Sequence, residues 1–96
     1  MTEKRIISWI FLAIALASQK ETVNLKGISM IADGINHAVP TEKEMRLSIS
    51  WLLNNRLIEK IGAKYQLTKN GMIMYNFASL KTNILFEIWR NLERQI

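Results

Sequence analysis

The stretch that most constrains the fold spans residues 40–65, and it begins with a signal for the start of a helix. Thr41 is followed three residues later by Glu44. This is the spacing of a capping box, in which each of the two side chains binds a backbone N–H at the helix start. Pro40 precedes the cap, and because proline disrupts helix interiors it marks the boundary. We therefore expect a helix that begins at Thr41 and ends near residues 54–56.

This helix is predicted to have two different sides. At about 100° per residue, its apolar side chains fall on one arc, and its cationic and small polar side chains fall on the opposite arc. The apolar arc holds Met45, Ile49, Leu52 and Leu53, and the polar arc holds Lys43, Arg46, Ser50 and Asn54. We expect the apolar arc to pack on the core and the polar arc to face outward.

Composition limits what kind of protein the chain can form. Its 96 residues suit one small domain, and a hydrophobic content of 49% predicts a packed core rather than disorder. There is no cysteine, which excludes a disulfide framework and a thiolate metal site. The formal net charge of +5 mildly favours an acidic partner, nucleic acid or an anionic membrane, although many basic proteins bind neither.

The first 18 residues allow two interpretations. Lys4 and Arg5 precede an apolar run at residues 6–17 that ends in Ala-Leu-Ala, as a secretory signal peptide does. These 12 residues would span roughly 18 Å as a helix, short of the ~30 Å hydrocarbon core, so we expect no membrane span. We favour a buried first helix within residues 1–20, and with it a cytoplasmic rather than an exported protein.

A second helix is predicted ahead of the capped one. Apolar residues three and four apart across residues 25–36 are typical of a helix, and Asn24 is a suitable N-cap. The short β-branched segment at residues 22–24 is suited to add a strand to a sheet. A helix, a short turn and a second, capped helix form the helix-turn-helix arrangement.

Two short strands and a helical region follow. Residues 57–61 and 64–67 are predicted strands, with Gly62 in the tight turn between them. Thr68 is suited to cap a helical region over residues 70–96, which Lys81-Thr82-Asn83 either breaks into two helices or only kinks. The expected fold class is mainly α with a small β-hairpin (α+β), in a single domain over residues 1–96.

This order of elements resembles the winged helix-turn-helix family of bacterial DNA-binding, transcription-regulator-like proteins. The resemblance covers residues 22–72, and it is carried by residues 49–58 (ISWLLNNRLI), then by YQLT at residues 65–68 and by Gly71. The family commonly has glycine where Arg56 stands, because the chain there adopts a left-handed conformation. Arginine in that conformation costs about 1–2 kcal/mol, or else Asn55 takes the left-handed position.

The resemblance implies a double-stranded DNA partner, because the second helix of this motif lies in the major groove. Arg46 is the candidate for reading guanine, since its fork can bond O6 and N7 together, and Leu47 is the candidate for a thymine methyl. The implied DNA-binding residues are Thr41, Lys43, Arg46, Leu47, Ser50, Arg56, Lys60 and Lys64. The alternative is that these are ordinary solvated side chains on an exposed surface.

The two terminal helices predict a homodimer. The first helix is apolar on nearly every side, which is more than a 96-residue chain readily covers. The candidate residues for a two-fold interface are Ile10, Ile14, Leu85, Trp89 and Leu92. The alternative is that the C-terminal helix covers the first helix within one chain, with Trp89 in the core.

No enzyme, cofactor or metal site is expected. His37 is the only histidine, cysteine is absent, and no glycine-rich phosphate-binding loop is present. We expect sequence-specific or semi-specific binding of double-stranded DNA by a dimeric transcription regulator, and the sequence does not name its effector. The alternative function is a winged-helix protein–protein interaction module within a larger complex, without DNA binding.

Overall fold

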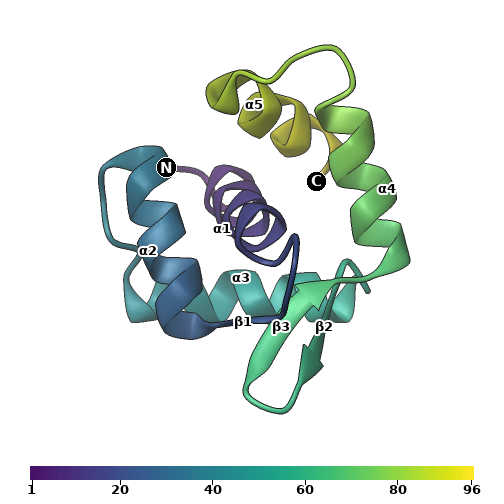
Figure 1. The fold of residues 1–96 in the computed structure, drawn as a ribbon. Coiled ribbons are helices and arrows are strands. Elements are labelled where there is room, and N and C mark those ends of the chain that lie inside the picture. Colours follow the sequence, from purple (N-terminus) through teal and green to yellow (C-terminus); the bar gives the residue numbers. More distant parts are fainter.

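Helix α1 (Glu3–Ala17) runs through the middle of the molecule (Figure 1). The structure is a computed structural model that describes all 96 residues. Residues 7–15 of α1 are all buried, and the Thr2 hydroxyl caps the helix by accepting a hydrogen bond from the Arg5 N–H at 3.2 Å. The segment that allowed two interpretations is thus the central core helix of the folded chain.

Helices α2 (Leu25–Asn36) and α3 (Glu42–Asn54) both pack against α1. Both predicted caps are confirmed: the Asn24 side chain accepts from the Gly27 N–H at 2.8 Å, and the capping box of Thr41 and Glu44 is closed in both directions at 3.0 and 2.9 Å. These short-range contacts fix where each helix begins.

A small antiparallel sheet lies beside α3. Its strands are β1 (Val23–Asn24), β2 (Ile58–Ile61) and β3 (Lys64–Leu67), in the order β1-β3-β2. The short strand suggested at residues 22–24 is therefore present. Gly62 has a φ of 63° in the turn between β2 and β3, a left-handed conformation that glycine adopts without strain.

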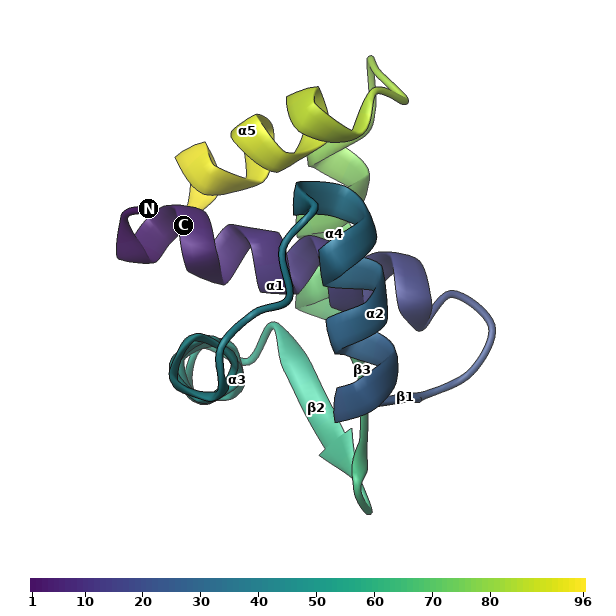
Figure 2. The same cartoon turned by 90° about the vertical axis from the view of Figure 1, so that its left-hand side faces the viewer.

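The C-terminal region forms two helices, α4 (Lys69–Ala78) and α5 (Leu85–Gln95). The helical region predicted over residues 70–96 is therefore broken into two helices near Lys81-Thr82-Asn83, and is not one kinked helix. In both views α5 lies on one side of α1, and the β2–β3 hairpin lies on the other (Figures 1 and 2). Near the start of α4, a Cβ atom on Gly71 would lie 2.0 Å from the Leu57 carbonyl oxygen, so the close approach of these segments requires glycine.

The expected subunit interface is mostly core, and that prediction is wrong for four of its five residues. Ile10, Ile14 and Leu92 are each 0% exposed and Trp89 is 1% exposed, so they have no accessible surface for a second copy. The physical reason is that α5 covers α1 within one chain. Only Leu85, which is 39% exposed, keeps surface of its own.

The fold is mainly helical, with five helices and one small antiparallel sheet, as the α+β prediction stated. Its interior is one cluster of 18 buried hydrophobic residues to which α1 contributes the largest share. None of the five helices has the length and apolar character needed to span a lipid bilayer.

Candidate nucleic-acid interface

The outward side of α3 is free of other elements. Lys43, Arg46 and Ser50 are exposed, while Ile49 and Leu52 on the inward side are buried in the core. Thr41 is exposed at the helix start, and its hydroxyl is engaged in the cap. The predicted division of α3 into an apolar and a polar side is therefore confirmed.

The exposed side of α3 is slightly hollowed. A shallow depression of about 410 Å³ is lined by Lys43, Arg46, Leu47, Ser50, Trp51 and Asn54. Trp51 and Asn54 were not among the predicted site residues. For Asn54 a signal was present, since it lies four residues after Ser50 on the same helix side. Its amide is also a group that can bond adenine in two places.

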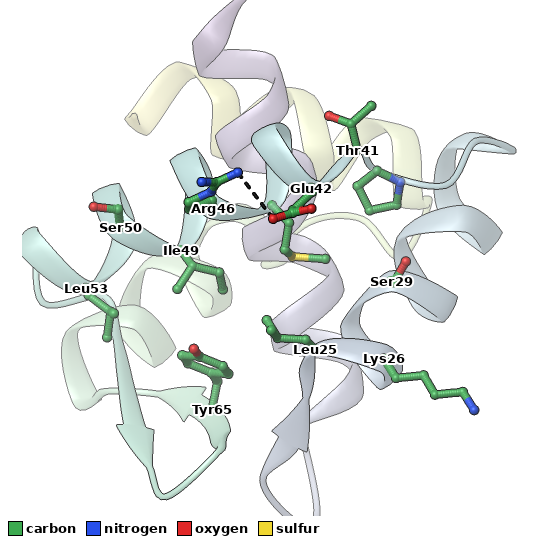
Figure 3. A pocket seen from close by; sticks show the side chains of 12 residues that line it. Leu25, Lys26, Ser29, Thr41, Glu42, Arg46, Ile49, Ser50, Leu53 and Tyr65 are labelled. Carbon is green, nitrogen blue, oxygen red and sulfur yellow. Dashed lines mark hydrogen bonds and ion pairs between the residues drawn. The ribbon is translucent and has the colours of Figure 1, made fainter.

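Two carboxylates, Glu42 and Glu44, stand in the first turn of α3. The Glu44 carboxylate is occupied by the cap, where it accepts from the Thr41 N–H at 2.9 Å. The Glu42 carboxylate accepts from the Arg46 guanidinium at 3.4 Å (Figure 3). Both partners of that pair are mostly exposed, at 72% for Arg46 and 90% for Glu42, so the contact is weak. Arg46 can therefore leave Glu42 for a stronger partner.

Arg56 takes the left-handed position at the exit of α3. Its φ is 57°, whereas Asn55 has a φ of −93°. The left-handed residue is therefore Arg56 and not Asn55. The Arg56 carbonyl accepts from the Thr68 hydroxyl at 2.6 Å, a bond that holds this turn against the start of α4. The Arg56 side chain is exposed between α3 and the hairpin.

The two hairpin lysines lie on opposite faces. Lys60 is opposite Tyr65 in the register, and its ammonium lies 6.0 Å from the centre of that ring. Lys64 is opposite Ile61, one position along each strand and hence on the other face. Because Tyr65 faces α3, the structure places Lys60 on the α3 side of the hairpin and Lys64 on the far side.

A larger groove separates α3 from the start of α2 (Figure 3). Its volume is about 630 Å³. It is lined by Leu25, Lys26, Ser29, Pro40, Thr41, Glu42, Met45, Arg46, Ile49, Ser50, Leu53 and Tyr65. Sequence patterns did not predict this groove, because α2, α3 and β3 meet there only after folding.

Positive charge prevails over the segment from α3 to the start of α4. Residues 41–69 hold six lysine or arginine residues and three glutamates, a surplus of three, and all six cations are exposed. Such a surplus attracts a polyanion in a manner that salt weakens.

Comparison with known proteins identifies no relative. A scan against models of protein families finds no match, and searches of curated proteins and of solved structures also find none. A functional assignment must therefore be argued from the geometry of this surface.

Proposed function

We propose that this chain binds double-stranded DNA through α3 and the β2–β3 hairpin, as proteins of the winged helix-turn-helix type do. The observation that carries the proposal is the exposure of Lys43, Arg46 and Ser50 on an α3 whose other side is buried in the core. A helix held in this way is 10–12 Å across with its side chains, about the width of the major groove. Helix α3 is held in place by packing against α1.

Roles follow from the position of each side chain along α3. Arg46 is proposed to pair with guanine, because its planar fork matches O6 and N7. Lys43, nearer the helix start, is suited to a phosphate, and Leu47 to a thymine methyl. Ser50 and Asn54 continue the same side of the helix by one turn each and extend the set toward further bases.

Arg56 and Lys60 extend the proposed contact beyond α3. Both are exposed, Arg56 at the exit of α3 and Lys60 on the α3 side of the hairpin. They are proposed to contact phosphates, which positions the protein without reading sequence. Lys64 lies on the far face of the hairpin, so its contribution is proposed to be smaller.

The homodimer remains a prediction. The apolar surface of the first helix, which was expected to face a second copy, is covered by α5 within one chain. Static light scattering at micromolar concentration measures the mass directly. A dimeric mass would support two copies on a two-fold DNA site.

The proposal is tested by fluorescence anisotropy with labelled genomic DNA fragments at several salt concentrations. Four or five neutralised phosphates predict a slope of log K against log salt of about −4, from roughly 0.9 per phosphate. Saturable binding with a slope of that size would support the proposal. No binding to any fragment at low salt would contradict it.

A second candidate function is a protein–protein interaction module. It is favoured by exposed apolar side chains where α4 ends and α5 begins: Phe77 is 70% exposed, Leu80 is 72% exposed and Phe86 is 55% exposed. Large apolar side chains exposed on neighbouring segments are common at contact sites between proteins. Loss of function on Leu80→Glu, with DNA-face substitutions silent, would favour this second candidate.

A further inference from the structure

We propose that the groove between α2 and α3 binds an amphipathic organic anion, with an aromatic body and a single carboxylate or sulfonate. We further propose that the bound anion displaces DNA. Binding of the anion concerns the groove alone, whereas displacement of DNA rests on the proposed function.

The groove has the size and composition of a small-molecule site. Its volume of about 630 Å³ lies within the roughly 300–1,000 Å³ usual for ligand pockets. Its apolar floor is formed by Met45, Ile49 and Leu53 of α3 together with Tyr65 of β3. Figure 3 shows Ile49 and Leu53 projecting from α3, with Tyr65 below them. Leu25 at the mouth is 47% exposed, so an occupant would remove apolar surface from water.

This apolar floor has no role in the proposed DNA contact. Phosphates, sugars and base edges are polar, and of the DNA bases only thymine offers a methyl group in the major groove. Met45, Leu53 and Tyr65 face the groove rather than the outer side of α3. An apolar body of aromatic shape suits them, since a methionine sulfur and a tyrosine ring both contact aromatic rings favourably.

The charges at the rim select an anion. Arg46 and Lys26 stand on the two sides of the groove, and Glu42 is its only carboxylate. Glu42 is already paired with Arg46, whereas Lys26 takes part in no ion pair. Lys26 extends outward in Figure 3, and its flexible four-carbon stem lets the ammonium turn toward the mouth.

The groove and the proposed DNA surface share side chains. Arg46 and Ser50 line both the groove and the depression on the outer side of α3. A carboxylate that pairs with the Arg46 fork takes the geometry that guanine would require. Anion and DNA would then compete, and by linkage each lowers the affinity for the other by the same factor.

The site is tested by following backbone amide NMR shifts of the full chain during titration with 2-naphthoate. The neutral probe 2-naphthylmethanol has the same ring system without the charge. We expect saturable shifts at Leu25, Ser29, Met45 and Leu53, with naphthoate bound at least about tenfold more tightly than the alcohol. Shifts confined to the α4–α5 surface, no saturation at millimolar naphthoate, or equal affinity for the two probes would overturn the site.

A matched pair of variants locates the binding. Leu25→Glu places a carboxylate at the groove mouth, at a position exposed enough to tolerate it, and should abolish naphthoate binding. Leu80→Glu makes the same chemical change on a side chain outside the groove that is 72% exposed, and should leave binding unchanged. Equal loss in both variants would overturn the assignment to the groove.

The competition between the anion and DNA is tested by measuring DNA binding with and without naphthoate. Naphthoate should weaken DNA binding by wild type and leave DNA binding by Leu25→Glu unaffected. If naphthoate fills the groove and DNA stays bound, the competition is overturned while the site stands. If wild type binds no DNA at all, the proposed function has failed and the competition with it, and the NMR titration decides the site independently.

Discussion

The indole N–H of Trp89 donates a hydrogen bond to the hydroxyl of Ser8 at 3.0 Å, across 81 positions of the chain. The same N–H reaches the Arg5 carbonyl at 3.1 Å, and the Arg5 guanidinium lies 3.9 Å from the centre of the Trp89 ring. The Trp89 ring also stacks near Trp9, at 6.3 Å between ring centres. These contacts fasten α5 to α1 and close the core within one chain.

Two buried serines should respond to alanine in opposite ways. Ser8 and Ser48 are both 0% exposed, but Ser8 bonds Trp89 and Arg5, whereas the Ser48 hydroxyl has no partner. Ser8→Ala should lower the free energy of unfolding by about 1–2 kcal/mol, and Ser48→Ala should leave it unchanged or raise it by up to about 1 kcal/mol. Urea denaturation measures both. Equal losses would contradict the bonding described for Ser8.

Two glycines should also respond in opposite ways. A Cβ at position 71 meets the Leu57 carbonyl oxygen at 2.0 Å, while a Cβ at Gly34 meets nothing within 4 Å. Gly71→Ala should therefore destabilise the fold by about 2 kcal/mol or more. Gly34→Ala, on an open side of α2, should stabilise it by about 0.5–1 kcal/mol. Thermal unfolding compares them, and a stable Gly71→Ala protein would show that α4 is not held so close to residue 57.

Arg56 should trade stability against DNA affinity. Its φ of 57° costs an L-residue about 1–2 kcal/mol, so Arg56→Gly should stabilise the fold by about 1 kcal/mol. Arg56→Ala removes the same side chain without relieving the strain and serves as the control. Both variants should weaken DNA binding equally, as measured by anisotropy. If Arg56→Gly binds DNA as wild type does, the side chain contributes nothing to the contact.

Removing one carboxylate should tighten DNA binding. Glu42 holds the Arg46 guanidinium at 3.4 Å and brings negative charge to the end of α3 that would meet DNA. Glu42→Gln should raise DNA affinity about twofold to fivefold, since an exposed pair of this kind is worth roughly 0.2–1 kcal/mol.

The control for this prediction is Glu59→Gln. It changes the net charge equally, on the outer face of the hairpin beside Gln66. Affinity that rises equally in both variants would show a general charge effect rather than the release of Arg46.

The sequence predicted the elements that depend on near neighbours. Thr41 and Glu44 define the start of α3 because the atoms that satisfy the cap lie three residues apart. Asn24 caps α2 for the same reason. The two sides of α3 followed from helical periodicity alone.

Features that depend on distant packing were missed or misplaced. Trp89 was expected at a subunit interface, but its partners Ser8 and Arg5 lie more than 80 positions away, and no local pattern reveals them. The groove was missed because Leu25 and Tyr65 approach α3 only in the folded chain.

The most direct test of the central claim compares two double variants in DNA-binding anisotropy. Lys43→Ala with Arg46→Ala removes two cations from the outer side of α3, and Lys81→Ala with Arg94→Ala removes two exposed cations from the α4–α5 side. We predict that the first pair weakens binding about 10- to 100-fold and that the second weakens it by less than about threefold. Equal binding by wild type and the α3 variant would contradict the proposal that α3 reads DNA.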